Sequence, residues 1–198
     1  MNVPAVQPIR LAGRWRDGYA LDYHTVGSAY VGDDGFGRPL FETTRTELGE
    51  LLFRLKFRGD ERTVAPLAQA AASFVAEWNA GIDAIVPVPP SRMRPRQPVL
   101  LLAAELAARV GVPALADAVD RVRENRELKN VYDYAERTRL LQGIHAVDRE
   151  AVAGRRVLLF DDLYRSGATM NSVAQALYDE GGAAEVFALT LTRTRSHK

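Results

Sequence analysis

The sequence predicts an α/β fold, with a mainly parallel, twisted sheet flanked by helices on both faces. Val157 to Phe160 is a run of four apolar residues after a polar turn, which is typical of a strand buried on both faces of a parallel sheet. After a short polar loop, apolar residues recur at the spacing of a helix face (Met170, Val173, Ala174 and Leu177). Strand-like runs at 82–88 and 186–191 complete a pattern of strands separated by helices, which indicates a parallel sheet.

The first 45 residues predict a small β-rich lobe, and residues 46–198 predict the α/β core. Strand-forming side chains are frequent between Gly18 and Val31, and the glycines and aspartates of 32–35 predict a turn. We expect this lobe to form a hood over the carboxyl ends of the strands, where open α/β sheets bind ligands. His24 lies in the lobe, and a lone histidine of this kind is more often structural than catalytic.

Three helices are predicted between the lobe and the charged segment described below. Residues 44–47 (Thr-Arg-Thr-Glu) form a capping box, and four leucines define one face of a helix that ends before Gly59 (Leu48, Leu51, Leu52 and Leu55). The second helix is predicted over 63–80. The third begins at Pro98, is apolar almost all round and therefore buried, and ends at Gly111.

The strand at 82–88 ends in an unusual way. Pro87 has no N–H to donate to a strand ladder, so it fits poorly in a central parallel strand. Local rules are most often broken at functional loops, and the carboxyl end of a strand is where such a loop is expected. The segment after Pro87 is therefore either a functional loop or a tight structural turn.

Residues 120–139 form the most highly charged segment, with acidic and basic side chains interleaved. Mixed charges of this kind usually indicate a solvated face or a loop. Lys129 differs in context, because it follows a strand-like run at 114–122 and precedes a helix predicted to begin near Asp133. A long loop with a basic tip could close over an anionic ligand.

Asp161 and Asp162 stand where the central strand ends, and a glycine-containing loop leads from them to a helix that Thr169 can cap. Loop amides and a helix N-terminus favour a phosphate. Two adjacent carboxylates repel each other and a phosphate, so the ligand should also carry hydroxyl donors or a metal, as a ribose 5-phosphate does. Response-regulator receiver domains also carry an acidic pair after a strand, but after their first strand and with a third acidic residue on a later one. Here only one strand-like run, 186–191, follows the pair, so the order of strands argues against a receiver domain.

Residues 161–169 resemble the 5-phosphoribosyl 1-pyrophosphate (PRPP) binding signature of type I phosphoribosyltransferases, Asp-Asp-x-x-Thr-Thr-Gly-x-Thr. Ser166 replaces one threonine conservatively, and Arg165 departs from the pattern. Residues 48–195 are similar to the ComF-like branch, named for a competence protein of bacterial DNA uptake, in segments 55–60, 86–89, 135–143 and 154–169. The chain departs from that branch in two ways. It has no cysteine, and hence no four-cysteine zinc module, and its asparagine-rich positions differ: Leu140 lies within 139–143, and Gln97-Pro98 stands where Asn-Gln is frequent.

The resemblance implies a type I phosphoribosyltransferase that uses Mg²⁺ held mainly by PRPP and passes phosphoribose to a small acceptor, of which a nucleobase is one candidate. Asp161 and Asp162 would hold the ribose, and Lys129 and Arg92 would stabilise the departing pyrophosphate. The 5-phosphate loop would comprise Tyr164, Arg165, Ser166, Gly167, Ala168 and Thr169. The pyrophosphate loop would comprise Val88, Pro89, Pro90, Ser91 and Arg92. Lys56 and Arg58 are further pyrophosphate candidates, although each is equally well explained as a cation near a helix C-terminus.

Composition sets the remaining expectations. The net charge of +1 predicts weak or no binding to nucleic acid, and no apolar run is long enough to span a membrane. Because the sequence has no cysteine and no visible signal peptide, we expect a cytoplasmic protein. The sequence does not decide between a monomer and a homodimer. The alternative function is PRPP binding without turnover, as a sensor or as an accessory of DNA uptake, because no catalytic base and no aromatic shelf for a nucleobase stand out.

Overall fold

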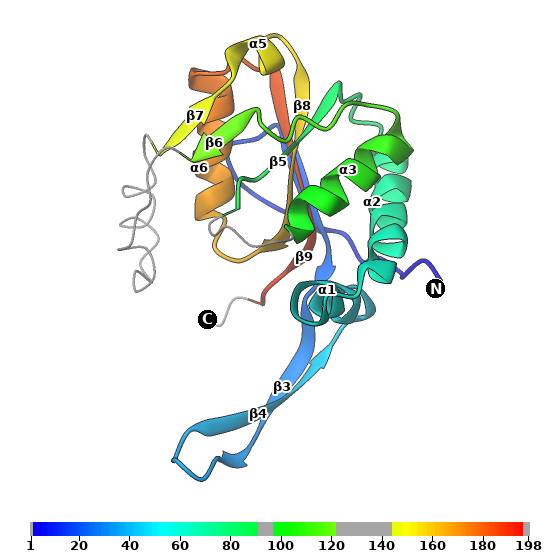
Figure 1. Ribbon diagram of the computed structural model, residues 1–198, viewed down its shortest axis with the longest axis vertical. Helices are drawn as coiled ribbons and strands as arrows, with labels where there is room; N and C mark the ends of the chain where they lie inside the picture. Colours follow the sequence, from blue (N-terminus) through cyan, green and yellow to red (C-terminus); the bar gives the residue numbers. More distant parts are fainter. Residues whose placement is uncertain (1, 91–96, 122–143, 196–198) are drawn as a thin grey trace.

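The computed structural model describes residues 2–90, 97–121 and 144–195 (Figure 1). Its main sheet has five strands in the order β1 (Ile9–Arg10), β2 (Asp17–Tyr23), β9 (Glu185–Arg193), β8 (Arg156–Tyr164) and β5 (Ala84–Pro87). β1 is antiparallel to β2, and the other pairings are parallel. The predicted α/β fold is confirmed.

Helices cover both faces of this sheet (Figure 1). On one face, α1 (Glu47–Arg58), α2 (Val64–Trp78) and α3 (Pro98–Val110) bury leucines and alanines against β8 and β9. The other face is covered by α6 (Ala168–Asp179) together with α5 (Arg149–Val152). A small antiparallel pair, β6 (Val119–Arg121) and β7 (His145–Val147), lies beside α6.

The parallel register brings the carboxyl ends of four strands to one edge of the sheet. Asp161 lies opposite Thr190, Pro87 opposite Phe160, and Tyr23 opposite Arg193. Open α/β sheets bind ligands outside this edge. The loops that follow β5 and β8 both leave the sheet there, so the two loops predicted from the sequence meet in space.

The predicted N-terminal lobe requires a correction. Residues 9–23 belong to the central sheet, since β2 pairs in parallel with β9, so a separate lobe over 1–45 is wrong for this segment. The part that stands apart is an antiparallel hairpin formed by β3 (Thr25–Asp33) and β4 (Pro39–Arg45). It leaves the carboxyl edge and extends away from the body (Figure 1).

Two predicted helix caps also differ. Thr46, and not Thr44, caps α1, because the Thr46 hydroxyl accepts a hydrogen bond from the amide of Gly49 at 3.1 Å. Gly167 is the N-cap of α6, so Thr169 lies inside its first turn. Both segments contain several residue types that can cap a helix, and only the backbone conformation decides between them.

The position of Pro87 is explained by β5 lying at the edge of the sheet. Val88 donates to Phe160 on β8, while Ile85 donates to Pro113 on the opposite side. Because successive residues of a strand alternate between the two sides, the nitrogen of Pro87 faces away from β8. The proline therefore costs the main ladder no hydrogen bond. Among the described residues, no helix combines the length and hydropathy needed to cross a membrane.

Candidate functional site

A pocket of about 350 Å³ lies at the carboxyl edge of the sheet, within the size range of small-molecule sites. Four stretches of the described chain line it: α1, the residues that follow β5, the start of α3, and the segment from β8 to α6. Its lining residues are Lys56, Val88, Pro89, Pro90, Gln97, Pro98, Val99, Asp161, Asp162, Leu163, Arg165 and Thr169.

The loop between β8 and α6 turns sharply at Gly167, whose φ of 78° lies in the left-handed region that favours glycine. A Cβ at this position would also meet the Tyr164 ring, with the hydroxyl only 2.2 Å away. That ring is held in place by an edge-to-face contact with Trp15, at 6.4 Å between centroids. The glycine therefore lets the loop close tightly against Tyr164 before the helix begins.

Asn171 fixes this loop to the rest of the molecule. Its side-chain amide donates to the carbonyl of Gly167 at 2.9 Å, and its side-chain oxygen accepts from the amide of Arg14 at 2.7 Å. The Asn171 side chain is buried, so both bonds are shielded from water. The loop conformation is thus set before any ligand arrives.

The first turn of α6 leaves amides without partners inside the helix, and the helix dipole adds positive potential there. The acceptor nearest this turn is the Ser166 hydroxyl, which lies 3.4 Å from the amide of Ala168. Arg165 and Thr169 line the pocket beside it. The arrangement has the donors and the charge that a phosphate needs.

Asp161 and Asp162 point to opposite faces of the sheet, since successive side chains of a strand alternate. Asp162 follows Phe160 on the face covered by α1, where it is nearly buried, and its carboxylate lies 2.9 Å from the Nζ atom of Lys56. Asp161 lies on the other face, the one that α6 covers, in line with Leu159. The two carboxylates therefore reach different parts of one ligand.

The surroundings of Asp161 also shift its pKa. Burial, reinforced by the negative charge of Asp162, raises the pKa of Asp161 to about 8, while its hydrogen bond from the Asp162 amide and the charge of Lys56 oppose this shift. Asp162 has an ammonium partner and Asp161 does not share it. The surroundings of Asp161 thus disfavour its ionisation in the free protein, while the ammonium of Lys56 lies against Asp162.

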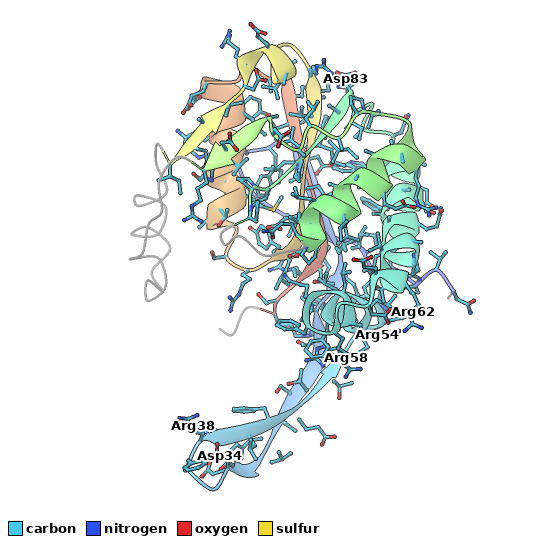
Figure 2. All side chains as sticks on the ribbon, viewed as in Figure 1. Asp34, Arg38, Arg54, Arg58, Arg62 and Asp83 are labelled. Atoms are coloured by element: carbon cyan, nitrogen blue, oxygen red, sulfur yellow. The ribbon has the colours of Figure 1, made fainter. Side chains whose placement is uncertain are left out.

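The structure brings most of the described predicted residues together. Lys56, Asp161, Asp162, Arg165, Thr169 and residues 88–90 line the pocket; Tyr164, Ser166, Gly167 and Ala168 form the adjoining loop. Arg58 is not brought there. It lies with Arg54 and Arg62 in a separate recess at the end of α1 (Figure 2). Ser91, Arg92 and Lys129 lie outside the described residues, as does the helix predicted from Asp133.

Other residues at this edge were not predicted as site residues. Gln97, Pro98 and Val99 line the pocket because α3 begins there. His24 accompanies them: its ring lies 3.1 Å from the Thr192 hydroxyl, and burial and the charges of Arg45 and Lys56 lower its pKa. Pro98 at the start of an apolar helix pattern is a usable sequence signal for α3, whereas nothing local in the sequence links His24 to Thr192, 168 residues later.

The carboxylates are suited to only part of a magnesium site. Mg²⁺ prefers oxygen ligands and usually keeps several waters while binding one or two carboxylates and substrate phosphates. Among residues 2–90, 97–121 and 144–195, no three His, Cys, Asp or Glu side chains gather around one point. Asp161 and Asp162 therefore suit a metal that arrives with a phosphorylated ligand better than a metal held by protein alone.

Comparisons with known proteins agree with this geometry. The chain is 30% identical to the competence protein ComFC of Bacillus subtilis over 152 residues, which cover 73% of this chain and 59% of ComFC. The chain thus spans less than two thirds of that relative's length. No protein-family model matches it.

Among solved structures, adenine phosphoribosyltransferase of Trypanosoma brucei, solved with AMP, pyrophosphate and ribose-5-phosphate, superposes with a TM-score of 0.50 at 13% identity. The superposition covers 93% of this chain and 73% of that enzyme. At this identity the similarity concerns the fold. The chain therefore resembles the competence protein ComFC in sequence and has the type I phosphoribosyltransferase fold.

Proposed function

We propose that this protein is a phosphoribosyltransferase that takes phosphoribose from Mg-PRPP, passes it to a small acceptor and releases pyrophosphate. The observation that carries the proposal is the single pocket in which a phosphate-binding loop, two carboxylates and a lysine meet. Each matches one part of PRPP: the 5-phosphate, the ribose hydroxyls and the pyrophosphate.

The 5-phosphate binds at residues 164–169, where the first-turn amides of α6 donate to its oxygens. Asp161 and Asp162 accept hydrogen bonds from the ribose hydroxyls. When the bond from C1 of the ribose to pyrophosphate breaks, the ring gains positive charge, which the nearby carboxylates stabilise. Mg²⁺ bound with PRPP would neutralise part of the negative charge of the pyrophosphate.

Lys56 has two roles in this proposal. In the free protein it neutralises Asp162, so that two carboxylates can share one pocket. When ribose hydroxyls occupy the carboxylate, the ammonium can turn to the pyrophosphate oxygens on the same side of the pocket. Lys129, from a segment outside the described residues, is the second cation we propose for the leaving group.

The test is pyrophosphate release from Mg-PRPP in the presence of purine, pyrimidine and related bases. We expect release with at least one acceptor, and loss of it in the Asp161→Asn, Asp162→Asn double variant. Lys129→Ala should slow the reaction by about 10²–10³ while changing PRPP affinity far less, because leaving-group charge grows in the transition state. Arg155→Ala, at the amino end of β8, serves as the control.

The similarity to a competence protein supports a second candidate, a PRPP-binding protein without turnover that acts in DNA uptake. This candidate predicts PRPP binding with no pyrophosphate release on any acceptor, and an effect of Lys129→Ala on affinity alone. It also predicts retention of single-stranded DNA that weakens steeply with salt. Tight DNA binding combined with no turnover would reverse the order of the two candidates.

A further inference from the structure

The hairpin of β3 and β4, residues 25–45, carries an unusual share of the exposed apolar surface; we call it the arm. Nine large apolar side chains are exposed among the described residues, and six of them belong to the arm (Val26, Tyr30, Val31, Phe36, Leu40 and Phe41). Phe36 at the tip is 89% exposed. Apolar side chains concentrated in this way mark an interaction site.

The arm has apolar side chains on both of its faces. Tyr30 and Phe41 are cross-strand partners whose rings lie 5.8 Å apart on one face. Since side chains alternate along β4, Leu40, next to Phe41, lies on the opposite face. A two-stranded hairpin is marginally stable in water, and the arm leaves the body of the protein (Figure 1). Within residues 2–90, 97–121 and 144–195, no other element therefore covers either face along most of its length.

The charge of the arm argues for a protein partner. Residues 25–45 contain three carboxylates, at Asp33, Asp34 and Glu42, against two guanidiniums, at Arg38 and Arg45. Arg45 lies at the base of the arm and pairs with Glu50, so the outer part of the arm is net negative. Nucleic acid would be repelled, because its binding depends on neutralising phosphates. The two aspartates lie at the tip, next to Phe36.

A complementary surface lies at the other end of the arm, where α1 ends. Arg54, Arg58 and Arg62 gather there (Figure 2), and Phe57 beside them is 66% exposed. We call these four residues the arginine surface. Asp60 pairs with Arg54 and Arg62, whereas no carboxylate among the described residues pairs with Arg58, whose guanidinium lies over the Phe53 ring at 5.6 Å.

We propose that the partner is a second copy of this chain, with the two arms lying antiparallel across a two-fold axis. The tip of each arm then meets the base of the other. Asp33 faces Arg58 of the second copy, Phe36 meets its Phe57, and the Tyr30–Phe41 pairs stack at the centre. A two-fold arrangement makes each of these contacts twice.

The mass in solution tests this proposal, measured by sedimentation equilibrium on the full chain over a hundredfold range of concentration. We expect a dimer for the wild type. Phe36→Ser with Phe41→Ser should weaken it by about tenfold or more, as loss of buried aromatic contacts does. Leu101→Ser, which removes an exposed leucine from α3, is the matched control and should leave the dimer unchanged.

A charge exchange tests the tip-to-base geometry and does not depend on the apolar substitutions. Asp33→Arg and Arg58→Asp should each weaken the dimer, and the double variant should recover most of the loss, because the pair is restored with opposite sign. A wild-type monomer at about 0.1 mM, the scale of a very weak association, would overturn the proposal. A dimer that is insensitive to the arm substitutions, or a double variant no better than the single ones, would do the same.

Discussion

Asp161 and Asp162 show how two identical neighbours acquire different chemistry. Alternation along β8 sends Asp162 towards Lys56 and α1, and Asp161 towards the face of α6. One carboxylate gains an ammonium partner, and the other is half-buried in the pocket beside a negative charge. A ligand with two adjacent hydroxyls can use both, because each carboxylate approaches from its own side.

The raised pKa of Asp161 predicts a pH dependence of stability. In the unfolded chain this carboxyl ionises near pH 4, whereas in the folded protein it keeps its proton up to about pH 8. Between these values the unfolded state binds fewer protons, so the free energy of unfolding falls as the pH rises. Asp161→Asn should remove this part of the fall. Urea denaturation at pH 5 and pH 8 measures it, and an identical fall in both proteins would contradict the assignment.

Lys56 should matter for pyrophosphate and Arg58 should not. Lys56→Met removes the only cation of α1 that lines the pocket within the described residues. Losing a hydrogen bond to a charged group costs about 1.5–3 kcal/mol, so pyrophosphate affinity should fall by about tenfold or more. Arg58→Met, two residues on, is the matched control. Titration calorimetry with pyrophosphate compares the two variants. An equal loss of affinity in both would show that Arg58 also contributes to pyrophosphate binding.

At the scale of elements, the conformation of the β8–α6 loop, which we propose binds the 5-phosphate, depends on how α6 is tied to the N-terminal segment. Asn171→Ala removes a donor to Gly167 and the acceptor for the amide of Arg14. Unpaired buried groups of this kind cost about 1–3 kcal/mol. We expect a lower free energy of unfolding, and weaker phosphate binding because the loop loses its support. Glu77→Ala, at an exposed position of α2, is the control. Equal phosphate affinity in Asn171→Ala would show that the loop keeps its conformation without Asn171.

The elements that could be predicted are those whose signals are local. The apolar run of β8, the acidic pair and the helix pattern of α6 are contiguous, and α3 has a proline at its start and a glycine at its end. β2 was misassigned because its partner, β9, lies at the other end of the chain. Its sequence, Asp-Gly-Tyr-Ala-Leu-Asp-Tyr, does not distinguish a central strand from a strand of a small lobe.

The candidate site, too, could be predicted only where its sequence signals are local. The β8–α6 loop and residues 88–90 follow strands whose carboxyl ends must share an edge, so their meeting follows from the fold class. The ion pair of Lys56 and Asp162 joins residues 106 positions apart, and it depends on how α1 packs. Lys56 and Arg58 are indistinguishable by sequence, being two residues apart on one helix; only the packed structure separates the residue in the pocket from the one outside it.

At the scale of the whole molecule, the two activities that we propose belong to two separate regions at the sheet edge. The pocket lies where β5 and β8 end, while the arm leaves from the end of β2 and carries apolar surface away from it. α1 joins the two, because Lys56 reaches into the pocket and Arg58 belongs to the arginine surface at the base of the arm. Ligand binding and self-association can therefore be tested by separate substitutions.

Calorimetric titration of Mg-PRPP into the wild type and two glycine variants tests the central claim most directly. Gly167→Ala places a methyl group against the Tyr164 ring and should abolish binding. Gly111→Ala is the matched control: its φ of 81° imposes a similar backbone strain of about 1–2 kcal/mol, but its surroundings are open and it lies at the end of α3. We expect the wild type and Gly111→Ala to bind PRPP equally. Unchanged affinity in Gly167→Ala would contradict the placement of the 5-phosphate at residues 164–169.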